Sequence, residues 1–170
     1  MTLDKLMKKL ANGDESAFEE IYDQTQKTVY YIALSVVKER GLAEDVMQTV
    51  YLNVLKNAKQ YRAGTNAAAW IAKITRNEAL NLMKKRGRVF YMDERANARV
   101  FGTGQADDYG LLIDLARRTL PEDEFAILML VAAAGYKRRE IAEMLEMPLS
   151  TVTWKFNQAT EKMRSSLKEN

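Results

Sequence analysis

Hydroxyl, amide and ammonium side chains gather in residues 151–158, on the second of two short helices predicted between Lys137 and Phe156. Groups of these kinds bond to phosphates and to base edges in a DNA major groove. The apolar residues of that helix, from Val152 to Leu167, form one stripe and leave the opposite face to the polar ones. The pattern favours a helix-turn-helix that reads DNA, with a plain helical hairpin as the alternative. The polar face comprises Thr151, Thr153, Trp154, Lys155, Asn157 and Gln158.

A second group of cations and amides lies along a helix predicted to begin near Thr65 or Asn66 and to end in the basic run KKRGR. Basic residues on one helix face can follow a nucleic-acid backbone, and a loop with aromatic and polar groups can hold an unstacked base. Tyr61 and Arg62 stand in such a loop. We expect Trp70 to belong to the core, and a solvated helix end is the alternative for KKRGR. The face comprises Lys73, Arg76, Asn77, Asn81, Lys84 and Lys85.

Catalytic chemistry has few residues to draw on. The sequence contains no cysteine and no histidine, which removes disulfides, thiolate and imidazole metal ligands and the most frequent general base. The acidic run PEDE, residues 121–124, is expected to stabilise a helix N-terminus. Asp45 and Gln48, one turn apart, have the spacing of ordinary surface residues. We therefore expect no enzyme activity, no cofactor and no metal site.

Composition indicates a globular protein that carries a mild excess of positive charge. The 170 residues are 47% hydrophobic and 29% charged, with a formal net charge of +3. Charges occur in every turn of the first 14 residues, and no apolar run approaches the ~18 to 20 residues needed to span a bilayer. We expect a cytoplasmic protein without direct membrane insertion.

Helical periodicity runs through almost the whole sequence, which contains two prolines. The expected fold is all-α, with two small helical domains. In the first domain, residues 1–90, one long helix begins after Asp14 and ends near Gly41, a second spans about 43–58, and the basic helix is the third. The stripe expected to be buried on the second helix comprises Val46, Met47, Val50, Tyr51, Val54 and Leu55.

Periodicity is lost in residues 91–110, which are expected to form a flexible linker. The second domain, residues 111–170, is expected to hold a short helix, a helix entered at Pro121 and the helix-turn-helix. Glu146 stands at the turn between the last two helices, where glycine would relieve a left-handed backbone. Glutamate there would cost about 1 kcal/mol, unless the turn is built differently.

Four segments spanning nearly the whole chain carry a further pattern: AFEEIYDQTQKTVYYIA, AEDVMQTVYLNVL, AAAWIAKITRNEALNLMKKRGR and LPEDEFAILMLVAAAGYKRREIAEMLEMPLSTV. Taken in this order, they resemble bacterial RNA polymerase sigma factors of the extracytoplasmic-function (ECF) group of the sigma-70 family. The resemblance implies that residues 1–90 are the family's region 2, that residues 111–170 are its region 4 and that the linker threads through polymerase. It also implies a protein that binds core polymerase, recruits it to promoters and helps to open the DNA, under control of an anti-sigma factor.

The same resemblance assigns roles residue by residue. Contact with core polymerase falls to Asp45, Gln48, Thr49, Leu52 and Asn53. Contact with the minus-ten strand falls to Tyr61, Arg62, Asn66, Lys73, Arg76, Asn77, Asn81, Lys84 and Lys85. Contact with the minus-thirty-five element falls to Arg138, Arg139, Ser150, Thr151, Thr153, Trp154, Lys155, Asn157 and Gln158.

Some positions depart from the family's usual residues: Thr49, Asn81, Glu146, Thr153 and Gln158. These departures would weaken the polymerase contact and the upstream DNA contact. Two alternatives therefore stand beside a promoter-directing sigma factor. One is a stand-alone helix-turn-helix regulator that binds an operator as a dimer, and the other is a sigma-like interaction module whose DNA binding has weakened.

Overall fold

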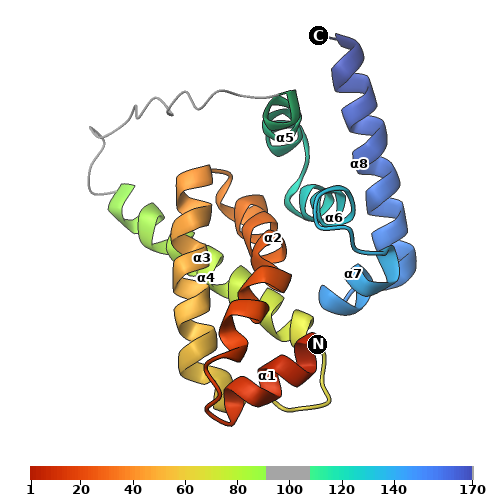
Figure 1. Ribbon diagram of the computed structural model, residues 1–170. Coiled ribbons are helices and arrows are strands. Elements are labelled where there is room, and N and C mark those ends of the chain that lie inside the picture. Colours follow the sequence, from red (N-terminus) through yellow and green to blue (C-terminus); the bar gives the residue numbers. More distant parts are fainter. Residues whose placement is uncertain (91–107, 170) are drawn as a thin grey trace.

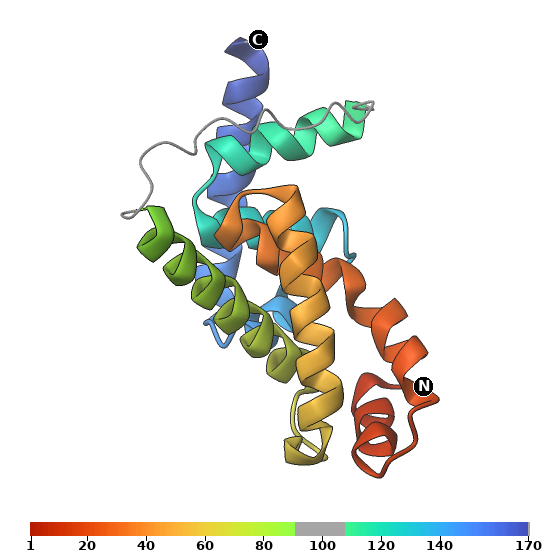
Figure 2. The same ribbon diagram turned by 90° about the vertical axis from the view of Figure 1, so that its left-hand side faces the viewer.

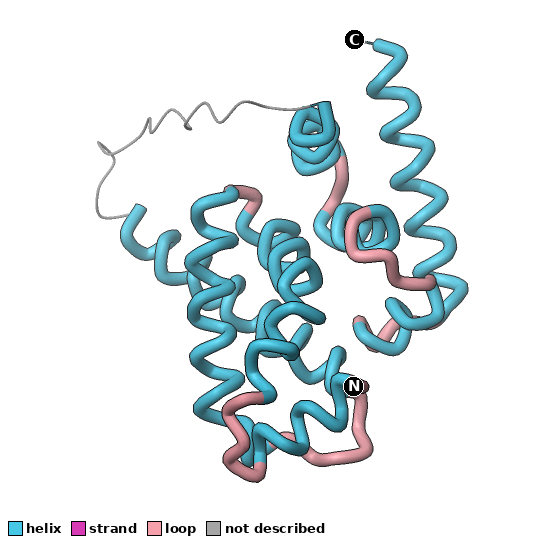
Figure 3. The backbone as a smooth tube through the Cα atoms, in the orientation of Figure 1, coloured by secondary structure: helices cyan, strands magenta, loops and turns pink. Residues whose placement is uncertain are grey.

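The computed structural model describes residues 1–90 and 108–169, and within them every regular element is helical, which confirms the all-α prediction (Figures 1 and 3). The first part of the chain forms α1 (Leu3–Ala11), α2 (Ala17–Val37), α3 (Arg40–Asn57), the short 3-10 helix η1 (Ala58–Gln60) and α4 (Ala67–Phe90). The second part forms α5 (Asp108–Thr119), α6 (Glu122–Ala132), α7 (Arg138–Met144) and α8 (Leu149–Glu169). Most of the expected linker, residues 91–107, lies outside the described part of the chain. Among the described helices none is both long enough and apolar enough to cross a membrane.

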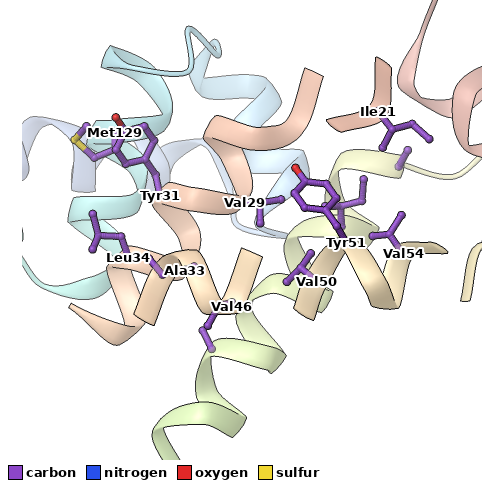
Figure 4. Close-up of a cluster of buried hydrophobic side chains, with 14 of the residues drawn as sticks. Ile21, Val29, Tyr31, Ala33, Leu34, Val46, Val50, Tyr51, Val54 and Met129 are labelled. Atoms are coloured by element: carbon purple, nitrogen blue, oxygen red, sulfur yellow. The ribbon is translucent and has the colours of Figure 1, made fainter. Parts of the chain in front are cut away.

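Helix α2 forms the centre of the first bundle, and α1, α3 and α4 pack around it (Figure 1). Its apolar stripe meets that of α3, so that Val29 and Val50 are fully buried (Figure 4). The buried hydroxyl of Tyr51 lies 2.9 Å from Oγ1 of Thr25, which gives this polar group the partner that burial requires. The periodicity of the sequence predicted this packing because burial of apolar side chains is what stabilises it.

The ends of α2 differ from the prediction. Helix α2 begins at Ala17 rather than directly after Asp14, and Leu3–Ala11 form the separate helix α1, which buries Leu6, Met7 and Leu10. Helix α2 ends at Val37 rather than near Gly41, because Lys38 adopts a left-handed φ of 58°. Nζ of Lys38 donates a 3.2 Å hydrogen bond to the carbonyl of Leu120, a residue distant in sequence. This tertiary contact holds the helix end in place.

Helices α6 and α8 form the core of the second bundle. Phe125, Ile127 and Leu130 of α6 are fully buried. The carboxylate of Glu124, also buried, accepts hydrogen bonds of 2.9 and 2.8 Å from Nζ of Lys162 on α8. Helix α6 begins one residue later than predicted, because Pro121 occupies its N-cap position.

Helices α7 and α8 are joined by a tight turn with a left-handed residue at its centre. Glu146 has a φ of 53°. The N–H of Met147 donates a 2.9 Å hydrogen bond to the carbonyl of Ala142, which closes the end of α7 as in a Schellman motif. The turn therefore has the backbone that favours glycine, and glutamate adopts it here.

Replacing Glu146 by glycine should stabilise the protein. The left-handed backbone costs a non-glycine residue about 1 kcal/mol, so Glu146→Gly is expected to raise the free energy of unfolding by about that amount. The matched control is Glu143→Gly, an exposed position inside α7, which should lose about 1 kcal/mol. Urea unfolding followed by circular dichroism measures both changes. A loss of stability in Glu146→Gly as large as that in Glu143→Gly would show that the left-handed backbone does not strain Glu146.

The two bundles pack against each other through α2 and α6. Figure 4 shows Met129 of α6 beside Tyr31 of α2, both buried. At the edge of this contact Oγ1 of Thr28 donates a 3.0 Å hydrogen bond to the hydroxyl of Tyr136. The boundaries of the two predicted domains remain a prediction, but their described residues share one apolar interface.

Candidate nucleic-acid and polymerase interface

Helix α8 presents a polar face of which only part is open to solvent. Trp154 is 58% exposed, although it is a large aromatic residue, and Ser150 and Asn157 are exposed beside it. Lys155 lies on the flank toward α6, where its Nζ is 3.2 Å from Oδ2 of Asp123. The exposed centre of the face is therefore narrower than the sequence pattern suggested. The remaining predicted residues of this face, half-buried, are Thr151, Thr153 and Gln158.

Two arginines stand at the start of α7, beside the polar face of α8. Arg138 and Arg139 are both exposed. The guanidinium of Arg138 lies 5.3 Å from the centre of the Phe156 ring, a distance typical of a cation–π contact. The aromatic ring holds this charge against α8, where a flanking phosphate could reach it.

Helix α4 carries a continuous basic stripe. Lys73, Arg76 and Asn77 are exposed, and their i, i+3 and i+4 spacing places them on one face of the helix. The stripe continues toward the end of the helix through the exposed residues Asn81, Lys84 and Lys85. The structure thus brings six predicted residues onto one face, hereafter the α4 stripe, that can follow a phosphate backbone.

The loop before α4 is held by residues that are distant in the sequence. Tyr61 is only 6% exposed, and its hydroxyl shares its one hydrogen between the carboxylate of Asp4 on α1 and the carbonyl of Thr65. The N–H of Gly64 donates to the same Asp4 oxygen at 3.0 Å. Asn66 caps α4 by accepting a 2.9 Å bond from the N–H of Ala69. The buried Tyr61 therefore holds the loop on its protein side, and Arg62 and Asn66 remain exposed on its solvent side.

Trp70 lies half-buried against the core of the first bundle, as expected from the sequence. Its ring meets that of Tyr61 edge to face, with 5.6 Å between the ring centres. The tryptophan therefore adds to the support of the loop.

The pKa values of Asp4 and Tyr61 reflect this support. The hydrogen bond from Tyr61, and then that from Gly64, lowers the pKa of Asp4 below its ordinary 3.8. Burial, and then the bond to Asp4, raises the pKa of Tyr61 to about 12 from an ordinary 10.0. The ionised Asp4 therefore contributes to the stability of the folded chain, and this contribution is lost only as pH falls below the ordinary pKa of aspartate. The contribution of the neutral Tyr61 hydroxyl is lost only as pH rises toward 12. Near neutral pH the loop is expected to be insensitive to pH.

Asp4→Asn should loosen this loop without unfolding the bundle. The substitution removes the charge that strengthens both hydrogen bonds, so the Gly64 amide is expected to exchange with solvent severalfold faster. Hydrogen exchange followed by NMR measures the rate. Asp23→Asn, at an exposed position of α2, is the control and should leave Gly64 unchanged. Equal exchange in both variants would show that Asp4 does not hold the loop.

Helix α3 and α2 border an apolar groove of about 610 Å³. Leu52, one of the predicted polymerase contacts, is 67% exposed on its rim. Gln48 also lines the groove, while Asp45 and Thr49 are exposed on the same side of α3. Asn53 is turned away, because its Nδ2 donates a 3.0 Å hydrogen bond to Oε1 of Glu78 on α4. The remaining lining residues are Phe18, Tyr22, Glu44, Met47, Tyr51 and Leu55.

Several of these neighbours were not predicted as site residues. Leu55 was expected to be buried with the rest of its stripe, but it is 39% exposed at the groove. Tyr22 is also exposed there, and neither residue departs from helical spacing, so the sequence contains no signal for the groove. Asp4 could not be found from local sequence either, because its partners are brought to it by the fold.

No metal site is found among the residues that the structure describes. The described residues contain no group of three or more Asp or Glu side chains placed to hold a metal ion. The arrangement offers an apolar groove, a basic stripe and a helix with exposed polar and aromatic groups. These surfaces suit protein and nucleic-acid binding.

Comparison with known families agrees with this assignment. The family described as "Sigma-70 region 2" matches residues 21–89, and that described as "Sigma-70, region 4" matches residues 111–163. The first match includes α3 and nearly all of α4, and the second includes the helix-turn-helix. Together they cover most of the chain and define a protein of the sigma-70 class.

Curated relatives resemble the chain over nearly its full length. ECF RNA polymerase sigma factor SigK of Mycobacterium tuberculosis (strain ATCC 25618 / H37Rv) is 25% identical over 181 residues, covering 97% of this chain and 93% of the relative. ECF RNA polymerase sigma factor SigW of Bacillus subtilis (strain 168) is 24% identical over 190 residues, covering 99% and 98%. The chain belongs to the ECF group of the sigma-70 family.

Solved structures share the fold at low sequence identity. The structure of CnrH in complex with the cytosolic domain of CnrY has a TM-score of 0.69 at 16% identity and covers 98% of this chain and 97% of its own. The sigma factor RpoE of Bartonella quintana, in complex with the anti-sigma factor NepR, has a TM-score of 0.64 at 20% identity and covers 89% and 96%. Both support the observed arrangement of helices.

Proposed function

We propose that this sigma factor directs transcription initiation through three separate surfaces. The α3 groove binds core RNA polymerase, the α4 stripe holds the melted minus-ten strand, and α8 reads the minus-thirty-five element. The observation that carries the proposal is the exposed α4 stripe, which lies within the part of the chain that matches sigma-70 region 2. The chemistry of initiation then belongs to polymerase, and the chain itself needs no catalytic group.

The loop between Tyr61 and Asn66 is proposed to receive one unstacked base of the minus-ten strand. It is exposed at Arg62 and Asn66, and Asp4 holds it from the opposite side. A loop that is fixed before DNA arrives loses less conformational entropy on binding. According to this proposal, the protein works in the cytoplasm, where it binds core polymerase and promoter DNA.

Contact with the minus-thirty-five element is proposed to be weak on its own. Lys155 is paired with Asp123, and Thr153 and Gln158 provide no positive charge, so few cations face the DNA backbone. Fewer phosphate contacts give lower affinity and a smaller dependence on salt. Binding inside the complete polymerase compensates, because tethering raises the effective concentration of each surface.

An anti-sigma factor is also proposed as a partner. The structural relatives support this, since CnrH was solved with the cytosolic domain of CnrY and RpoE with the anti-sigma factor NepR. The α3 groove, with Leu52 exposed, offers an apolar surface that such a partner could cover in place of polymerase.

The decisive experiment is run-off transcription by purified bacterial core polymerase on a pool of randomised promoters, with and without the protein. We expect specific starts that share minus-ten and minus-thirty-five elements. Core binding in a pull-down without specific transcription would favour the weakened interaction module instead. Absence of both, together with a stable dimer on a palindromic site, would favour the operator-binding regulator.

A further inference from the structure

Arg76, in the middle of the α4 stripe, already has an anionic partner within the chain. Its Nε and Nη2 donate hydrogen bonds of 3.1 and 2.8 Å to Oε1 of Glu122, the first residue of α6. The two residues come from different bundles. About half of the Arg76 side chain remains exposed, at 51%, so the pair stands at the edge of the contact between the bundles.

The turn of the helix-turn-helix lies against the same helix. Lys73, Arg76 and Asn77 of α4 line a hollow of about 240 Å³ together with Met144, Leu145 and Glu146 of the turn. Glu146, whose φ of 53° shapes the turn, is one of these lining residues. The small residues Ala69 and Ala72 also line the hollow and allow the turn to approach α4 closely. Figure 2 shows α7 lying behind α4 in this region.

An apolar contact supports these polar ones. Ile32 and Ala72 of the first bundle are buried in one cluster with Ile127, Leu130 and Ile141 of the second. Hydrogen bonds and ion pairs also link the bundles, and they include those that join Thr28 to Tyr136, Lys38 to Leu120, Arg117 to Lys38, Arg40 to Asp114 and Gly110, and Arg76 to Glu122. The second bundle is thus docked on the first at a defined surface.

We propose that Arg76 of the α4 stripe has two mutually exclusive partners: the phosphate backbone of single-stranded DNA and the Glu122 carboxylate at the edge of the second bundle. In the closed chain described here, Glu122 takes the hydrogen bonds of Arg76 that a phosphate oxygen would accept. A phosphate that takes these hydrogen bonds must displace Glu122, which weakens the contact between the bundles. The inference rests on the proposed role of α4 in DNA binding.

Chemistry favours this competition. Carboxylate and phosphate oxygens accept the same donors from arginine, and a partly exposed ion pair contributes little to stability in water. The Glu122 pair therefore adds only a little to the apolar contact that docks the bundles, and a phosphate can replace the carboxylate at Arg76 at small cost. The acidic run PEDE, expected only to stabilise a helix N-terminus, also supplies partners to three cations: Arg76, Lys155 and Lys162.

The absence of native cysteine allows a direct test of closure. Spin labels at Lys59→Cys and Lys168→Cys, exposed on η1 and α8, report the distance between the bundles in the complete chain. The parent should give one narrow distance distribution. Glu122→Arg should increase the population of longer distances about fivefold, because it replaces attraction by repulsion at Arg76. Glu122→Gln should give a smaller change in the same direction, and Arg76→Glu combined with Glu122→Arg should restore the closed distribution.

DNA affinity tests whether the two occupants share the surface. The probe is a single-stranded oligonucleotide of random sequence at low salt, measured by fluorescence anisotropy. Glu122→Arg should bind it about fivefold more tightly than Glu161→Arg, which adds the same charge at an exposed position of α8. An unchanged distance distribution would overturn the proposal, and so would opening without this gain in affinity. Neither measurement uses polymerase or a promoter, so the run-off assay judges the proposed function separately.

Discussion

Leu52→Asp is expected to lower the affinity of the chain for core polymerase by about 100-fold, the effect of losing a central apolar contact at a protein interface. Leu52 is 67% exposed on α3 and lines the apolar groove with Gln48. An aspartate there would place a charge against any apolar partner surface, and it would cost the free chain little because the position faces solvent. Pull-down or surface plasmon resonance with purified core polymerase measures the loss.

The control is Leu167→Asp, which changes an exposed leucine on α8, far from α3. Thermal unfolding should show that both variants remain folded, and only Leu52→Asp should lose polymerase binding. Equal loss in both would point to a general effect of the added charge. Full binding by Leu52→Asp would remove the groove from the proposed polymerase interface.

Local periodicity was enough to predict the helices but not all of their ends. The long apolar stripes of α2 and α3 decide the element type, since each stripe must be buried. The end of α2 depends instead on Lys38, whose ammonium binds the carbonyl of Leu120 in the other bundle. A contact between such distant residues forms only after both bundles have folded, so no local pattern records it.

The sequence predicted the polar face of α8 in outline, but not the contacts of its side chains. Trp154 was expected on the polar face because it lies opposite the apolar stripe, and it is exposed there. Lys155 was expected beside it, yet it turns toward Asp123 of α6. Helical spacing places a side chain on a face, whereas the identity of its nearest partner depends on the neighbouring helix.

For the α4 stripe, too, the sequence predicted which face the residues share but not which residues they contact. Spacing placed Lys73, Arg76 and Asn77 on one exposed face, as observed. Nothing in that spacing indicates that Arg76 binds Glu122 or that the turn at Glu146 lines the same hollow. These contacts depend on how two separately patterned bundles dock, which requires the three-dimensional structure.

Arg76→Ala is expected to slow promoter opening about 10- to 100-fold, the range that follows from losing one charged hydrogen-bonding contact of about 1.5 to 3 kcal/mol. Permanganate reactivity of unpaired thymines near minus ten, measured on a promoter selected in the run-off assay, reports opening directly. Arg86→Ala is the matched control, because Arg86 lies on the same helix with 53% of its side chain exposed and is also paired, to Glu39. Core binding should be unchanged in both, and normal opening by Arg76→Ala would remove this residue from the minus-ten surface.

Arg76 also takes part in closing the chain, so its removal has two opposing effects on opening. Loss of the pair with Glu122 weakens the contact between the bundles, which alone would favour promoter opening, whereas loss of the guanidinium removes a contact with the DNA backbone. Glu122→Gln separates the two, because it weakens closure and keeps Arg76 intact. If DNA contact dominates, Glu122→Gln raises promoter opening while Arg76→Ala lowers it. If Arg76 served closure alone, both variants would raise opening, and the double variant would resemble either single one.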